Sequence, residues 1–392
     1  MSPICAAALT LMPDILPPPD PQAASTSARL TELIREEIAS GGGWLDFERY
    51  MELALYAPGL GYYSAGSVKL GPHGDFITAP ELSAIFGSVI AAQLRGILTE
   101  LSSPVILELG AGTGSLAKAV LDAFGAGGGA IPDYWILELS ADLRERQREC
   151  LAAYEGHIRW LDVLPDVGFE GVILANEVAD ALPVAAFVKR EAQLLPLGVG
   201  VRDGRLDWAD GPASKTLSAT VAALEHKLAR ALPTGYRSEL SLRLPAWIAA
   251  VTAPLRRGAV LLIDYGLVRR EYYHASRSSG TLVCHYRHRA HEDPFFYPGL
   301  QDISAWVDFS ACADALASTG LSVAGFTTQA QFLMHGGALE MLASASGREA
   351  LLQGQALKTL MLPGEMGERF KLLLATRGLD ATLPGRDLRD RL

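Results

Sequence analysis

The chain of 392 residues lacks an excess of basic side chains, since it has 34 Lys and Arg against 44 Asp and Glu. The resulting net charge of -10 argues against a nucleic-acid partner, because such partners need a broad basic face. Cysteine is also scarce, and the four cysteines (Cys5, Cys150, Cys284 and Cys312) lie far apart. Their spacing excludes a dense disulfide framework and a cysteine-rich zinc site, and it fits a reducing compartment.

Long apolar runs and early basic residues are missing as well. No apolar run reaches the roughly 20 residues of a membrane-spanning helix, so we expect no stable membrane insertion. No Lys or Arg precedes Arg29, so the first residues lack the charged start of a signal peptide and the basic residues of a transit peptide. We therefore expect residues 1–25, which are rich in proline, to form a mobile leader, and the protein to be cytoplasmic.

A glycine-rich turn is the most informative segment that is present. The apolar run Val105–Leu109 predicts a buried strand, and Leu116–Phe124 predicts the helix after it. Between them stand Gly110, Gly112 and Gly114, which have no Cβ and let a ligand approach the backbone beside the helix N-terminus. A turn of this kind is typical of sites for nucleotide-containing cofactors.

Two cofactor classes compete for this turn. A dinucleotide site would follow the pattern G-x-G-x-x-G/A, but Ser115 stands where the third small residue belongs. Glu108, two residues before the first glycine, suits an amine-bearing cation better than a pyrophosphate. The segment resembles the first motif of class I methyltransferases that use S-adenosylmethionine (SAM), and a nicotinamide dehydrogenase is disfavoured.

Strands and helices alternate after this motif, which predicts an α/β fold with a doubly wound, mostly parallel, seven-stranded sheet of the Rossmann-like kind. A further acid, Glu138, lies at the end of the second strand about 20 residues after the glycines, where dinucleotide folds bind ribose hydroxyls. The expected strands are Val105–Leu109, Tyr134–Leu139, Ile158–Leu161, Gly171–Ala175, Ala259–Ile263, Leu321–Phe326 and Phe370–Thr376.

The order of these elements predicts the domain organisation. Helices expected at Ser27–Ala39, Phe47–Leu55 and Glu81–Leu101 place an N-terminal helical region with an active-site loop at residues 26–103. The cofactor-binding core then covers 104–182, an inserted subdomain 183–242, and the rest of the core 243–392 with a loop insertion at 266–300. Insertions at this end of a doubly wound sheet usually shape the substrate side.

Four segments together resemble one family, the MidA-type SAM-dependent methyltransferases, over roughly residues 30–378. These segments are Gly74–Glu81 (GDFITAPE), Leu107–Gly114 (LELGAGTG), Asn176–Pro183 (NEVADALP), and Ile263–Gly266 (IDYG) with the Gly280–Leu282, His288, Pro298–Gly299, Asp302–Ile303 and Val307–Phe309 that follow it. Val178 and Ala179 depart from the bulky aromatics that the family usually has. The family includes a mitochondrial assembly factor that methylates an arginine of respiratory complex I.

The resemblance implies a function and a set of site residues. We expect SAM-dependent methylation of a protein arginine, in a complex I subunit or a similar protein. The cofactor-binding residues would be Glu108, Gly110, Gly112, Gly114, Glu138, Asp162 and Asn176. The catalytic carboxylates would be Glu177, Asp180 and Asp75, and the substrate-side residues Thr78, Pro80, Glu81, Asp264 and His288.

Other interpretations of these residues and of the chain stay open. Asp162 can be a plain turn residue, Asp180 can begin a helix, and Thr78 with Pro80 can mark a helix start. The histidines between 274 and 291 do not match an established metal-ligand spacing, so no metal is expected. A SAM-binding assembly factor with little turnover, and a methyltransferase acting on a small molecule, remain alternatives, and the oligomeric state is open.

Overall fold

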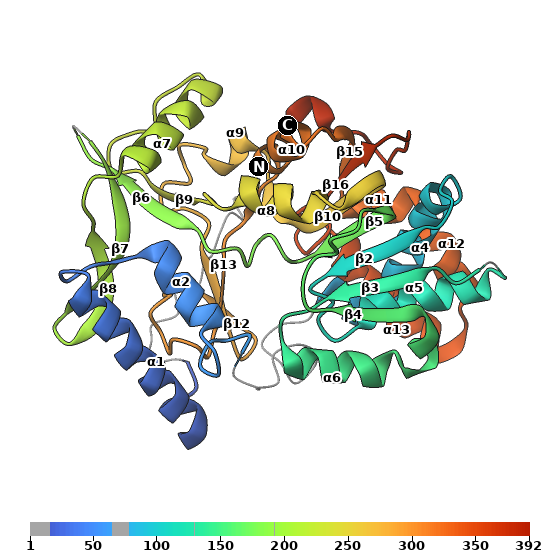
Figure 1. The fold of residues 1–392 in the computed structure, drawn as a ribbon, viewed down its shortest axis with the longest axis horizontal. Coiled ribbons are helices and arrows are strands. Elements are labelled where there is room, and N and C mark those ends of the chain that lie inside the picture. The colour runs from blue at the N-terminus through green and yellow to red at the C-terminus, as the bar shows by residue number, and fades with distance from the viewer. Residues whose placement is uncertain (1–15, 65–77, 129, 192) are drawn as a thin grey trace. The chain divides into compact units, whose positions relative to one another are not determined.

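The computed structural model describes residues 16–64, 78–128, 130–191 and 193–392. Its chain divides into two compact units, each built from three segments of the sequence (Figure 1). Unit 1 comprises Met1–Phe76, Pro183–Ser241 and Tyr273–Ala305, and unit 2 comprises Ile77–Leu182, Leu242–Tyr272 and Trp306–Leu392. The glycine-rich turn and most of the predicted site residues belong to unit 2.

An eight-stranded sheet forms the centre of unit 2, with the order β15-β16-β10-β5-β2-β3-β4 and with β14 paired to β10. The pairs from β4 to β10 are parallel, whereas β16 is antiparallel to β10 and β15. The strands are β2 (Val105–Leu109), β3 (Asp133–Leu137), β4 (Ile158–Leu161), β5 (Phe169–Asn176), β10 (Leu255–Leu267), β14 (Val307–Asp308), β15 (Ser322–Thr328) and β16 (Phe370–Arg377). The expected α/β fold is thus confirmed in outline, with a mixed sheet of eight strands rather than seven, because the short β14 adds to β10.

Helices cover both faces of this sheet. Successive side chains of a strand point to opposite faces, and here both sets are apolar, so each face needs a covering layer. Ile106 and Val172 belong to one apolar cluster with residues of α4 and α5, while Leu107 and Ile173 belong to a second with residues of α8 and α10. The helices of unit 2 are α3 (Ala79–Leu82), α4 (Ala84–Leu98), α5 (Ser115–Ala126), α6 (Ala141–Cys150), α8 (Leu244–Thr252), α9 (Arg269–Tyr272), α10 (Phe309–Ser318), α11 (Gln329–His335), α12 (Ala338–Ser344) and α13 (Gly347–Met361), with 3-10 turns at Ala152–His157 and Arg389–Arg391.

The single helix expected at Glu81–Leu101 is wrong, because Ser83 divides it into α3 and α4. Ser83 is extended, with φ -154° and ψ 128°, and its hydroxyl accepts the backbone N–H of Ile85. A serine side chain that accepts a backbone N–H at the start of a new helix competes with the hydrogen bonds that would extend the preceding helix. The consequence is a short first helix, α3, which carries Pro80 and Glu81 beside the glycine-rich turn.

The described residues of unit 1 form two antiparallel sheets and three helices. The larger sheet has five strands in the order β1-β7-β6-β9 with β8 paired to β7, and the smaller has the order β12-β11-β13. The elements are α1 (Pro21–Ser40), β1 (Leu45–Asp46), α2 (Phe47–Tyr56), β6 (Ala185–Lys189), β7 (Leu194–Arg202), β8 (Arg205–Asp210), α7 (Lys215–Leu228), β9 (Arg237–Leu240), β11 (Val283–Tyr286), β12 (Arg289–His291) and β13 (Asp302–Ser304).

Helix α1 begins six residues earlier than the sequence predicts. Asp20 is its N-cap, since its carboxylate accepts the backbone N–H groups of Gln22 and Ala23. Pro21 then fits the first turn, where a missing N–H costs nothing. Residues 21–25 of the predicted mobile leader are therefore helical, and its first fifteen residues lie outside the described part of the chain.

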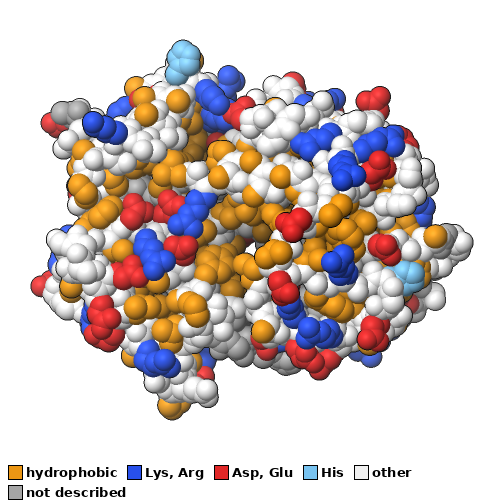
Figure 2. Space-filling model, viewed as in Figure 1, with side chains coloured by type: hydrophobic (Ala, Val, Ile, Leu, Met, Phe, Trp, Pro, Cys, Tyr) orange, Lys and Arg blue, Asp and Glu red, His pale blue; other side chains and the backbone are white. Residues whose placement is uncertain are grey.

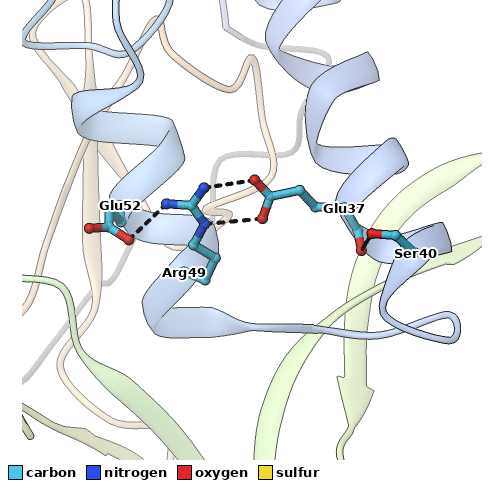
Figure 3. Close-up of polar contacts among 4 residues, drawn as sticks. All are labelled: Glu37, Ser40, Arg49 and Glu52. Carbon is cyan, nitrogen blue, oxygen red and sulfur yellow. Dashed lines mark hydrogen bonds and ion pairs between the residues drawn. The ribbon is translucent and has the colours of Figure 1, made fainter.

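An arginine joins the two N-terminal helices of unit 1 (Figure 3). Arg49 of α2 donates two hydrogen bonds to the Glu37 carboxylate of α1, at 2.7 and 3.0 Å, and a third to Glu52 at 2.9 Å. Such bidentate pairing fixes the guanidinium plane as well as its charge. It raises the pKa of Arg49 further above its ordinary value, so this link persists at any physiological pH.

The surface and the helices bear on possible partners. Figure 2 shows Lys and Arg side chains of the described residues interspersed with Asp and Glu on the face in view. Mixed charge of this kind creates no large field of one sign across that face.

Among the described helices, none combines the length and the apolar character that crossing a membrane requires.

Candidate active site

The glycine-rich turn has the backbone conformation that its sequence predicts. Gly110, Gly112 and Gly114 have φ values of 61°, 55° and 86°, a region that favours glycine because a Cβ would be strained there. Gly114 is the N-cap of α5, so the unpaired N–H groups of that helix begin at the turn. The Thr113 hydroxyl donates to Glu81 of α3 at 3.1 Å, which ties α3 to the turn.

Glu108 is buried on strand β2, with 2% of its surface exposed. Its carboxylate accepts a 2.7 Å hydrogen bond from the hydroxyl of Tyr134 on β3. Burial raises the pKa of Glu108 to about 7, and the nearby charge of Glu138 adds to the effect. A cation that came close would restore the ionised form, so this carboxylate is suited to receive an ammonium group.

Glu138 follows β3 and is held in one orientation. Its Oε1 accepts the backbone N–H of Ser140 at 2.9 Å, and its Oε2 accepts the side-chain amide of Gln147 at 3.2 Å. Burial raises its pKa above the ordinary value, while these two hydrogen bonds and the charge of Arg144 lower it. Asp162, which follows β4, differs because its side chain is 86% exposed and pairs with Arg144 at 2.7 Å.

Two exposed apolar side chains accompany these acids, and the sequence analysis did not select them. Leu139 directly follows Glu138 and is 82% exposed, and Val163 directly follows Asp162 and is 71% exposed. Large apolar side chains left open at the ends of parallel strands are a surface that a ligand's ring can cover. A sequence signal existed, since in both places an apolar residue follows an acid at a strand end.

A second group of acids lies where β5 ends. Asn176 donates its amide to Glu177 Oε1 at 3.2 Å, and Glu177 has a φ of 54°, which is unusual outside glycine. Burial raises the pKa of Glu177 to about 8, with the charges of Asp180 and Glu81 contributing. Burial likewise raises the pKa of Asp180 to about 6. Strained, charge-rich positions of this kind concentrate at functional sites.

Asp264 shapes this group from strand β10. Its carboxylate accepts the backbone N–H groups of Ala179, Asp180 and Tyr265 at 3.1, 3.2 and 2.9 Å. Burial and the charges of Asp180 and Glu177 raise its pKa well above the ordinary value. The neighbouring Tyr265, which the sequence analysis did not select, donates its hydroxyl to Asp180 at 2.5 Å. Asp264 and Tyr265 together hold Asp180 in place.

The remaining predicted residues are placed as follows. Thr78 is the N-cap of α3 and makes no capping bond with its side chain, and Pro80 lies in the first turn of that helix. Asp75 lies outside the described residues. His288 belongs to unit 1, where it is exposed in the turn between β11 and β12 with a φ of 61°. The described residues contain no cluster of His, Cys, Asp and Glu that could hold a metal ion.

The raised pKa of Glu177 predicts how stability responds to pH. The folded-state pKa of about 8 exceeds the ordinary 4.5, so stability that depends on this proton falls as pH rises through that window. Gln has no proton to lose, so the variant Glu177→Gln does not suffer this loss. Its free energy of unfolding, relative to that of the wild type, should therefore increase by roughly 1 kcal/mol or more as pH rises through this range. Thermal unfolding at about pH 5 and about pH 8.5 measures this difference, and equal values at both would contradict the raised pKa.

Comparison with known proteins identifies the family. Residues 88–327 match the family model described as "Putative S-adenosyl-L-methionine-dependent methyltransferase". The chain belongs to this family. A Burkholderia thailandensis protein whose crystal structure holds S-adenosylhomocysteine is 43% identical, with a TM-score of 0.88 over 95% of this chain and 99% of that one. This methyltransferase therefore uses SAM as its methyl donor.

Curated relatives give a more specific comparison. The mitochondrial protein arginine methyltransferase NDUFAF7 of Danio rerio is 28% identical over 92% of this chain and 90% of its own. The homologue of Drosophila melanogaster is 29% identical over 94% of this chain and 90% of its own. Both names include the word mitochondrial, so the expected cytoplasmic location is wrong. Composition and scarce early basic residues were the basis of that expectation, and neither reports directly on a compartment.

Proposed function

We propose that the methyltransferase methylates an arginine side chain of a protein, in a subunit of respiratory complex I or a similar partner. The names of the curated relatives support arginine as the acceptor. Carboxylates at the end of β5 support it from the chemistry of the chain itself. The single observation that carries the proposal is the state of the Asp180 carboxylate. Asp180 is 7% exposed, and its buried Oδ1 has no side-chain hydrogen-bond partner among the described residues.

The cofactor would lie across the ends of β2, β3 and β4. Glu108 would receive its ammonium group, Glu138 its ribose hydroxyls, and the glycines the close approach of its chain. Leu139 and Val163 would cover its adenine, and Asp162 would contribute at the edge of that ring. When bound, SAM supplies a methyl group on a positively charged sulfur, ready for in-line displacement.

An arginine acceptor needs activation, because its guanidinium is protonated at any ordinary pH, with a pKa above about 12, and its lone pairs are delocalised. A carboxylate pair can bind the planar fork through two nitrogens. The pair also draws positive charge toward those nitrogens, which leaves more electron density on the third. Glu177 and Asp180 would form this pair, with Asp75 as a third acid. Their raised pKa values mean that an arriving guanidinium would stabilise the ionised forms.

Mapping the transferred methyl group tests this function. The full-length protein is incubated with isotope-labelled SAM and an extract that contains assembled and unassembled complex I, and labelled peptides are sequenced by mass spectrometry. We expect the label on an arginine of a complex I subunit. Label on another side chain or a small molecule would overturn the arginine assignment, and binding of SAM without any label would favour an assembly factor with little turnover.

A further inference from the structure

One helix of unit 2 connects the ends of three consecutive strands. Helix α6 presents Arg144 and Gln147, which are three residues apart and therefore lie on the same helix face. Arg144 donates to the carbonyl of Glu138 after β3, to the carbonyl of Leu161 on β4, and to Asp162. Gln147 connects the glycine-rich turn with the same region. Their bonds fix the relative positions of the proposed cofactor contacts.

Gln147 uses every polar atom of its side chain in these contacts. It is 0% exposed, and its Nε2 donates to the carbonyl of Gly112 at 2.9 Å and to Glu138 Oε2 at 3.2 Å. Its Oε1 accepts the indole N–H of Trp160 at 3.1 Å. A buried amide with all its bonds satisfied is rigid, and so are the groups that it holds.

The bond to Gly112 also orients the turn. A carbonyl and the N–H of the same planar peptide point in opposite directions, so the Thr113 N–H points away from α6. Gln147 also lies near the turn, since a Cβ added at Gly114 would meet the Gln147 side chain at an ordinary contact distance of 3.5 Å. A single side-chain amide thus links the turn to Glu138.

We infer that Gln147 is a positioning residue for SAM, acting through Glu138 and the Gly112 carbonyl rather than by touching the cofactor. This inference rests on the proposed place of the cofactor at Glu138. Glu138 carries the ribose contact, and Gln147 keeps its carboxylate aimed while the Ser140 N–H holds the other oxygen. The nearby groups that also act on Glu138 are Arg144, which stabilises its charge, and Glu108, which repels it.

The test replaces Gln147 by Met, which keeps the volume and removes all three hydrogen bonds. We expect the Kd for S-adenosylhomocysteine and the KM for SAM to rise about 10- to 100-fold, with kcat at saturating SAM within about threefold. Without the Gln147 hydrogen bond the pKa of Glu138 rises, so binding should weaken at a higher pH than in the wild type as the solution is acidified. Circular dichroism and thermal unfolding verify the fold, and Gln147→Asn, expected to be intermediate, replaces Met if that variant does not fold.

Trp160→Phe is the matched control, because it removes one bond of Gln147 and keeps the two that reach Glu138 and Gly112. Its affinity and pH profile should stay within about threefold of the wild type. If Trp160→Phe weakens binding as much as Gln147→Met, or if Gln147→Met leaves it unchanged, the positioning role is wrong. If Glu138→Gln also binds like the wild type, the proposed cofactor site itself is wrong.

Discussion

Glu177→Gln should reduce methyl transfer by about a thousandfold while SAM affinity stays within about threefold. Gln keeps the shape of the side chain and can still occupy the unusual φ of 54° about as well as Glu. It cannot carry the negative charge that binds and polarises a guanidinium. Single-turnover transfer of labelled methyl to the mapped protein substrate, with calorimetry for S-adenosylhomocysteine, separates the two effects.

Tyr265→Phe is the graded control for this variant. It leaves both carboxylates in the chain and removes the 2.5 Å hydrogen bond that orients Asp180. We expect roughly a tenfold loss of transfer, because one hydrogen bond to a charged group is worth about 1.5–3 kcal/mol and part of that orientation survives through Asp264. Full turnover by Glu177→Gln would remove Glu177 from the mechanism, whatever Tyr265→Phe does.

The sequence predicted the centre of unit 2 well, since the deciding signals there are local. Val105–Leu109 and Ile158–Leu161 are strands to the residue, because short apolar runs between a turn and a helix have few alternatives. The glycines follow β2, Glu138 follows β3 and Glu177 follows β5, so the selected residues lie at strand ends, while their roles stay a prediction. Parallel strands place their carboxyl ends together, so order along the chain is enough to predict the edge at which they lie.

What the sequence left unpredicted depends on side chains from distant segments. Gln147 looks like a polar residue on a charged helix, and only the structure shows that it is buried and hydrogen-bonded to three distant groups. Tyr265 likewise reaches Asp180 across 85 positions of the chain. Helix starts at Asp20 and Ser83 were missed for a different reason, because several nearby polar residues could have capped the backbone equally well.

Glu138 and Asp162, both selected from the sequence as cofactor-binding acids, should respond very differently to removal. Glu138→Ala should weaken S-adenosylhomocysteine binding about 100-fold or more, whereas Asp162→Ala should cost less than about fivefold. Glu138 is 7% exposed and its carboxylate is held by Ser140 and Gln147, so it is already arranged to accept two ribose hydroxyls.

The Asp162 carboxylate is not held in one orientation in this way, because its side chain is 86% exposed. Its partner Arg144 would still donate hydrogen bonds to two backbone carbonyls if Asp162 were removed. Solvent screens an acid in that position, and its loss leaves no buried group without a partner. Calorimetry at one salt concentration measures both variants against the wild type. Equal losses of affinity in the two variants would mean that the ribose does not bind at Glu138. If it does bind there, the buried and oriented Glu138 must contribute more to affinity than the exposed Asp162.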